Sequence, residues 1–337
     1  MQLTEKQSLA ITFIRAMSIV LIVITHFFQA NESYWAWWLN VGVQVFLFMS
    51  GFLFGGKHIN NISFWYQKRF KKILIPYYIY IIIVLPIYFL LIGEVSITKT
   101  LGYALNLQGI TGTLNGLGHL WFLTVIMLCY FITPGLQILN ISRKENKELK
   151  YYLLLAVLCL GIQTLSFFLP FSSDPWIIGP GIITYILGYY TSKRYEGRIP
   201  NKIFLLLLLG TLMIVPLNLF TFLPGLTIIF TISHILIGSL IFVGLYKLIS
   251  EKNVLLKENF QVIRQLDKYS FEIYITHLIY IIGPFALIKL TTFSVVNVLL
   301  ILLLILISSY TLKKIQTIFD TLLTKNTLNR KTGLSKS

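Results

Sequence analysis

The sequence predicts an all-α fold, a polytopic membrane protein built as a bundle of about ten transmembrane helices. Of the 337 residues 56% are hydrophobic and 12% are charged, whereas a soluble domain carries about 25% charged residues. Long apolar runs recur along the chain, and a helix needs roughly 17 to 25 such residues to cross the hydrocarbon core of a bilayer. Backbone groups in lipid must be hydrogen-bonded within their own segment, so these runs are expected to be helices.

Ten spans and one domain follow from these runs. The spans are expected at 9–28, 40–56, 73–92, 119–139, 151–169, 176–191, 203–221, 227–249, 269–290 and 294–312. The sixth contains Pro180 and several glycines, so a broken or re-entrant segment is the alternative there. Residues 1–312 would form a single transmembrane domain, followed by a basic cytoplasmic tail over 313–337.

The positive charge of the chain is unevenly distributed. The net charge is +16, and with the N-terminus inside, all but three of the 28 Lys and Arg residues fall in cytoplasmic segments. Lys99 and Lys289 fall outside, and Arg15 lies within the first helix. This asymmetry follows the positive-inside rule, so both termini are expected in the cytoplasm and no nucleic-acid partner is implied. The first helix has no small-residue cleavage pattern and is expected to remain in the protein.

The two cysteines give no sign of a chemical role. Cys129 and Cys159 both lie inside expected spans. They show neither metal-ligand spacing nor a disulfide framework. We therefore interpret them as packing residues and expect no metal.

Ionisable side chains inside the spans are the first candidates for function, because one at mid-membrane costs roughly 2.5 to 3.5 kcal/mol. Arg15 and His26 are eleven residues apart, a rotation within about 20° of three full turns, so they share one helix face. Arg15 would lie in the inner part of the membrane and His26 near its outer boundary. Imidazole can take and return a proton near neutral pH, so this face could line a reaction path. Snorkelling of Arg15 and an interfacial position of His26 are the alternatives.

Polar residues of the second helix could join this path. Ser50 and Gly51 suit a close helix contact or a ligand path equally well. Gln44 lies toward the outer side, and its amide needs partners in the bundle, so it could orient His26 or an acceptor hydroxyl.

A cationic segment leads into the third helix. It contains Lys68, Arg69 and Lys72. These cations fit positive-inside topology and attraction to anionic lipid, and they fit the phosphates of a cytosolic cofactor equally well. The residues alone leave both interpretations open.

Two later helices bring further polar groups. His119 and Trp121 begin the fourth helix at the expected level of His26. Trp121 alone fits an aromatic belt, but beside two histidines it would suit a sugar. In the ninth helix His277, nearer mid-membrane, is a candidate for a buried polar contact. Glu272, the one acidic residue in any expected span, fits a position at the level of the headgroups.

At these residues the chain resembles the acyltransferase-3 family of membrane acyltransferases, which modify surface glycans, lipids and other acceptors in many bacteria. The segments concerned are 15–26 (Arg-x10-His), 42–52 (Gly-Val-Asp-x-Phe-Phe-x-x-Ser-Gly-Phe), 69–77 (Arg-x-x-Arg before Pro), 119–123 (His-x-Trp-[Phe/Tyr]-Leu) and 269–277 (Ser-Tyr-x-x-Tyr-x-x-His). Each motif alone is weak, but five in order on such a chain are specific. Gln44 departs from the usual acidic residue, and Lys72 replaces an Arg, which keeps the charge but loses its planar fork.

The resemblance implies an acyl-CoA-dependent O-acyltransferase in a bacterial plasma membrane. It would move an acyl group, acetyl by default, from cytosolic acetyl-CoA to a hydroxyl of a surface glycan or exopolysaccharide. The expected catalytic residues are His26, as general base, and Arg15. The expected CoA-binding residues are Arg15, Ser50, Lys68, Arg69 and Lys72, and the expected substrate-binding residues are Gln44, His119, Trp121 and His277.

Two other classes of function remain open at this point. A polysaccharide exporter or flippase would use the same polar path without CoA and without covalent chemistry. A membrane-embedded sensor or scaffold would need only packing and loops. Direct transfer is expected in the enzyme, with an acyl-histidine as the alternative.

Overall fold

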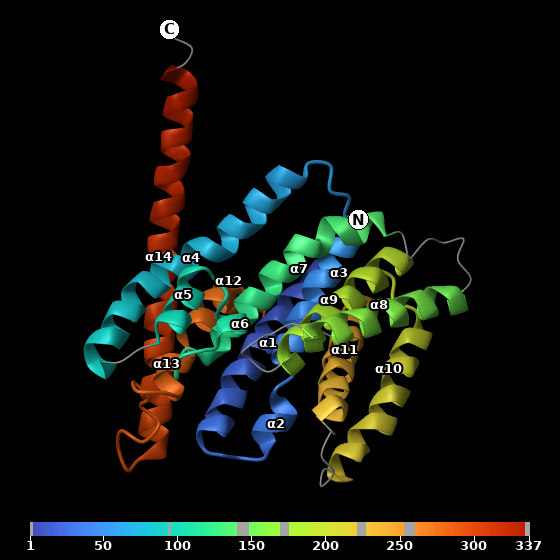
Figure 1. The fold of residues 1–337 in the computed structure, drawn as a ribbon, viewed down its shortest axis with the longest axis horizontal. Coiled ribbons are helices and arrows are strands. Elements are labelled where there is room, and N and C mark those ends of the chain that lie inside the picture. Colours follow the sequence, from blue (N-terminus) through green and yellow to red (C-terminus); the bar gives the residue numbers. More distant parts are fainter. Residues whose placement is uncertain are drawn as a thin grey trace.

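The computed structural model describes residues 3–93, 96–139, 148–168, 175–220, 227–252 and 260–333, and every regular element in these ranges is a helix (Figure 1). The elements are α1 (Glu5–Ala30), α2 (Trp35–Leu39), α3 (Gly42–Gly55), α4 (Ile62–Ile92), α5 (Ile97–Ala104), α6 (Gln108–Thr111), η1 (Gly118–Leu120), α7 (Trp121–Ile138), α8 (Glu148–Phe168), α9 (Pro175–Tyr195), α10 (Asn201–Ile214), η2 (Val215–Phe220), α11 (Thr227–Lys252), α12 (Phe260–Thr276), α13 (Leu278–Ile281) and α14 (Ser294–Gly333). The predicted all-α class is confirmed.

Eight helical segments within the described ranges are long and apolar enough to cross a membrane. They are α1, α2–α3, α4, η1–α7, α8, α10–η2, α11 and α14. The chain is therefore a polytopic membrane protein. The sixth and ninth expected spans correspond to α9 and α12, which are not among the eight. Helix α9 runs without a break from Pro175 to Tyr195 although it contains Pro180.

Helix α9 is held in the centre of the bundle by glycine contacts with α3. A Cβ atom on Gly51 would lie 1.9 Å from the carbonyl oxygen of Tyr185, and one on Gly188 would lie 2.1 Å from that of Phe48. Small residues allow two helix backbones to approach this closely. Tyr185, Tyr189 and Tyr190 are almost completely buried. Gly51 is therefore a helix contact, one of the two roles considered for it.

The ninth expected span is not one helix, so the prediction of a continuous helix over 269–290 is wrong beyond Thr276. Helix α12 ends there, and α13 adds one short turn. The Nδ1 atom of His277 donates to the carbonyl oxygens of Ile273 and Tyr274, at 3.2 and 2.8 Å, and so competes with the backbone for helical acceptors. Gly283, with φ of 107°, and Pro284 then prevent the helix from resuming.

The cationic segment is part of a helix. Asn61 caps α4 by accepting a hydrogen bond from the amide of Phe64 at 2.9 Å. From this cap α4 continues into the apolar span, so Lys68, Arg69 and Lys72 are held in fixed helical positions. At the other end of the chain, α14 continues past residue 312 and extends beyond the bundle (Figure 1).

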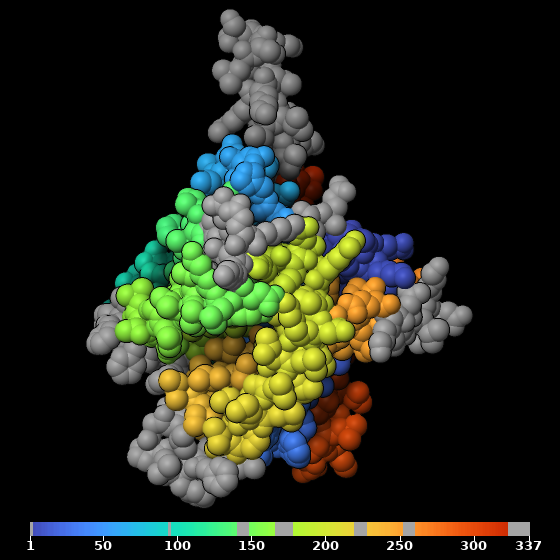
Figure 2. Space-filling model, turned by 90° about the vertical axis from the view of Figure 1, so that its right-hand side faces the viewer, coloured from blue at the N-terminus to red at the C-terminus, as the bar shows by residue number. Residues whose placement is uncertain are grey.

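Two helices present apolar side chains outward. Figure 2 shows a face of the molecule covered by α8, in green, and α10, in yellow-green. Their exposed residues include Leu153, Val157, Leu160, Leu205, Leu209 and Leu212. Exposed leucines along the length of a helix suit contact with lipid chains.

Candidate active site

Two cavities lie at different levels along α1. One, the Arg15 cavity, has a volume of about 400 Å³ and is lined by Arg15 together with residues of α3, α4, α7, α12 and α14. The other, the His26 cavity, has a volume of about 640 Å³ and is lined by His26 together with residues of α3, α5, α11 and the segment 113–121. The two residues predicted to share one face of the first helix therefore each line a cavity.

The Arg15 cavity is strongly cationic. Its basic residues are Arg15, Lys57, Arg69, Lys72, Lys268 and Lys313, and its acidic residues are Asp267 and Glu272. Arg15 pairs with Asp267 at 2.7 Å and Lys313 with Glu272 at 2.8 Å. Within the described residues the other four cations form no ion pair. The cavity therefore keeps a surplus of positive charge suited to an anionic ligand.

Two details of these cations also favour an anion. The Nε atom of Arg69 is buried and has no hydrogen-bond partner among the described residues, which leaves a donor available to a ligand. Burial, with the charges of Arg69 and Lys68, lowers the pKa of Lys57. A bound phosphate would relieve this crowding of like charges.

The structure brings most of the expected cofactor-binding residues together. Ser50, Arg69 and Lys72 line the Arg15 cavity, whereas Lys68 is exposed and lies outside its lining. Lys57 and Lys313 line the cavity and were missed. The available signal for Lys313 was Glu272, because a carboxylate inside an expected span needs a cation. In the structure Glu272 is 1% exposed and pairs with Lys313.

Three histidines meet at the other level. The ring centroid of His277 lies 5.1 Å from that of His26 and 4.8 Å from that of His119. They come from α1, η1 and the break between α12 and α13, so residues far apart in sequence form one cluster. His26 is partly exposed and His119 is buried, and both line the cavity, whereas His277 is buried and lies outside its lining.

Hydrogen bonds fix the tautomer of each ring. Nδ1 of His26 donates to Oε1 of Gln29 at 2.8 Å, and Nε2 of His119 donates to the carbonyl oxygen of Ile275 at 3.0 Å. His277 donates through Nδ1, as described above. Each neutral ring therefore keeps one nitrogen without a proton, and for His26 this is Nε2. A base at this position can accept a proton from a ligand in the cavity.

The polar lining of the His26 cavity suits a hydroxyl-rich ligand. Gln29, Gln44, Asn40, Asn115 and Thr113 provide amides and a hydroxyl. Trp121 lines the same cavity and could pack against a sugar ring. Gln44 was also considered as the residue that orients His26, but the partner of His26 is Gln29. The signal for Gln29 was its position three residues further along the same helix.

Phe46, Phe122 and Tyr274 form a cluster of rings that reaches both cavities through Tyr274, and we call it the aromatic partition. Tyr274 lines both of them, and Phe46 and Phe122 line the Arg15 cavity. The ring of Phe122 lies 5.2 Å from that of Tyr274 and 6.5 Å from that of Phe46. The hydroxyl of Tyr274 donates to the carbonyl oxygen of His119 and so ties the partition to the histidine cluster.

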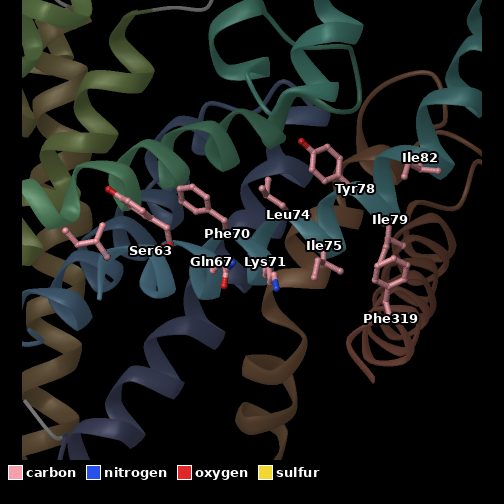
Figure 3. Close-up of a pocket in the computed structure, with 12 residues that line it drawn as sticks. Ser63, Gln67, Phe70, Lys71, Leu74, Ile75, Tyr78, Ile79, Ile82 and Phe319 are labelled. Atoms are coloured by element: carbon pink, nitrogen blue, oxygen red, sulfur yellow. The ribbon is translucent and has the colours of Figure 1, made fainter. Parts of the chain in front are cut away.

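A separate groove on the outside of α4 lacks these features. It has a volume of about 880 Å³ and runs along α4 to Phe319 of α14 (Figure 3). Its described lining is mainly apolar, and Lys71 is the one charged residue in it. We therefore place the candidate active site at the two cavities along α1.

Comparison with known families identifies the class of protein. A family model described as an acyltransferase domain matches residues 8–314, nearly the whole chain. The chain belongs to the acyltransferase-3 family and is a membrane acyltransferase. No curated protein and no solved structure matches it.

Proposed function

We propose that this acyltransferase is an acyl-CoA-dependent O-acyltransferase of a bacterial plasma membrane. It moves an acyl group, by default acetyl, from cytosolic CoA to a hydroxyl of a surface glycan or exopolysaccharide. The observation that carries the proposal is the pair of cavities along α1, one cationic and one lined by histidines, with the aromatic partition reaching both of them.

The Arg15 cavity is the donor site in this proposal. CoA carries a diphosphate and a further phosphate, and Lys57, Arg69 and Lys72 offer cations that have no carboxylate partner among the described residues. Arg69 supplies the bidentate fork, whereas Lys72 acts as a point charge. Ser50 lies in the same lining, where the pantetheine arm would pass.

His26 is the general base at the acceptor site. The acceptor hydroxyl attacks the thioester carbonyl carbon, so that a C–O bond forms and the C–S bond breaks. Nε2 of His26 takes the hydroxyl proton and returns it to the departing thiolate. Gln44, His119 and Trp121 position the acceptor or the thioester, and His277 supports both neighbouring imidazoles through ring contacts.

The aromatic partition favours group transfer over export. An exporter needs a continuous path wide enough for a chain of sugars, whereas the two cavities are separate and the ring of Tyr274 lines both of them. A thioester at the end of a thin arm needs far less room. This contrast supports the enzyme over the flippase.

Release of free CoA thiol tests the proposal. Purified protein in lipid nanodiscs is supplied with acetyl-CoA, with and without candidate glycans. Glycan-stimulated release is expected, and His26→Ala is expected to lower its rate about 10²- to 10⁴-fold. The matched control is His58→Ala, an exposed histidine outside the lining of both cavities. Absence of both turnover and acetyl-CoA binding would favour the exporter. Normal turnover by His26→Ala would show that His26 is not the general base.

A further inference from the structure

The His26 cavity has one charged side chain in its described lining, Lys99 of α5. The rest of its polar lining consists of neutral amides, a threonine hydroxyl, imidazoles, the phenol of Tyr274 and the indole of Trp121. Among the described lining residues there is no carboxylate. The charge of Lys99 is therefore not neutralised within the lining.

Lys99 differs in this from the cations of the Arg15 cavity that are held by acids. Arg15 and Lys313 each have a carboxylate partner, whereas no hydrogen bond or ion pair involving Lys99 occurs within the described residues. Lys99 is half-buried and contributes to the lining of the cavity. A half-buried cation without a partner is available to a ligand in the same cavity.

Topology does not account for Lys99. The positive-inside preference explains most cations of this chain, but it disfavours lysine on the outer side. By the expected topology Lys99 and Lys289 are the two basic residues there. Lys289 is exposed and does not line the cavity, so the two lysines differ in a way that an experiment can use.

We propose that Lys99 makes the His26 cavity selective for anionic acceptors, glycans or polyols that carry a carboxylate or phosphate group. The inference rests on the proposed role of this cavity as the acceptor site. The ammonium of Lys99 donates to the acid group, while the amides bind neutral hydroxyls and one hydroxyl reaches His26. A charge-assisted hydrogen bond is about twice as strong as a neutral one, so a ligand with an acid group should bind more tightly than its neutral counterpart.

Binding of matched probes to the full-length protein in nanodiscs tests this selectivity. The first probe is a tetrasaccharide of alternating glucuronic acid and N-acetylglucosamine. The second is the same tetrasaccharide with its carboxylates reduced to hydroxymethyl groups, and the third is a glycerol phosphate tetramer. The variants are Lys99→Gln, Lys99→Arg and, as the matched control, Lys289→Gln.

The expected result is a difference in affinity ratios. Wild type should bind at least one acidic probe about tenfold more tightly than the reduced probe. Lys99→Gln should abolish this ratio, whereas Lys99→Arg and Lys289→Gln should keep it. Preference for one acidic probe alone would identify the acid group as carboxylate or phosphate. Equal affinities in wild type, an unchanged ratio in Lys99→Gln, or no binding of any probe would overturn the proposal.

The binding measurement also separates this inference from the proposed function. It requires no acyl-CoA, so Lys99-dependent binding without thiol release would uphold the acidic ligand and reject the acyl transfer. Glycan-stimulated thiol release, together with an affinity ratio of acidic to reduced probe that does not depend on Lys99, would uphold the acyl transfer and reject the acidic ligand.

Discussion

At His26 a single hydrogen bond decides which ring nitrogen is available. Gln29 accepts from Nδ1, so Nε2 is the nitrogen of the neutral ring that carries no proton and would serve as the proposed base. Gln29 also lines the His26 cavity but lies on its exposed side. In the proposed mechanism Gln29 is therefore a positioning residue, acting through the orientation and tautomer of His26.

Replacement of Gln29 tests this role. Gln29→Leu removes the acceptor and should lower kcat for acyl transfer by about tenfold, while KM for acetyl-CoA stays unchanged. Gln29→Glu keeps an oxygen acceptor at the same position and should recover most of the rate. Equal losses in both variants would show that Gln29 has only a structural or acceptor-binding role.

Neighbouring cations of α4 should differ sharply in their importance. Arg69 lines the Arg15 cavity, and Lys68 next to it is exposed and does not. Arg69→Gln should weaken acetyl-CoA binding about tenfold, the effect expected from losing a hydrogen bond to a charged group. Lys68→Gln, the matched control, should leave the affinity unchanged. The affinity of each variant for acetyl-CoA can be measured by calorimetry. Equal weakening by both substitutions would show that the segment attracts CoA only through its overall charge.

Much of the site could be predicted from residue types, and the rest required the fold. Arg15 and His26 follow from helical phase, and both line cavities as expected from their shared face. Lys57 and Lys313 belong to segments more than two hundred residues apart, and no periodicity within one helix can bring them together. Lys68 was included among the expected CoA-binding residues because a run of cations in the sequence does not show which side chains face the cavity.

Among the elements, α3 and α9 depend on each other more closely than any hydropathy pattern suggests. Gly51, Gly55 and Gly188 leave the two backbones in direct contact. The spacing of Gly51 and Gly55 is the kind that marks a helix contact in membranes, so this part was accessible from sequence. The partner helix was not, because α9 combines modest hydrophobicity with Pro180.

A methyl group in this contact should destabilise the protein. Gly188→Ala places a Cβ 2.1 Å from the Phe48 carbonyl oxygen, and the backbone must move to relieve the clash. We expect a loss of roughly 1 to 3 kcal/mol, seen as a lower melting temperature of the purified protein. Gly161→Ala in α8 is the matched control, since its Cβ would meet nothing within 4 Å. That substitution should be neutral or stabilise by about 0.5 to 1 kcal/mol.

For the whole molecule, the distribution of charge predicts an orientation. Lys6 and Glu32 are exposed near opposite ends of α1, so they should face opposite sides of the membrane. In intact cells a membrane-impermeant maleimide should label Glu32→Cys, and it should label Lys6→Cys only after permeabilisation. The parent protein, with buried Cys129 and half-buried Cys159, provides the background. The opposite labelling pattern would show that the orientation is the reverse of the predicted one, with the proposed donor site on the outer side.

The number and class of helices at this scale were largely predictable, whereas the break at His277 was not. Apolar length gives the spans directly, because lipid leaves the backbone no other partner. At the break the imidazole of His277 bonds to two carbonyl oxygens of its own helix and also contacts the rings of His26 and His119. The same contacts assemble the cluster, so the element that was mispredicted lies at the site.

The aromatic partition also has an electrical consequence. If the two cavities hold water, most of the voltage across an energised membrane would fall across the thin layer of rings in the aromatic partition. Moving a unit charge through that field involves about 2.3 kcal/mol per 100 mV, whereas a neutral acetyl group crosses without electrical work. In the proposed mechanism the thioester chemistry would therefore not depend on the transmembrane voltage, and the same rings would hinder the passage of protons through the enzyme.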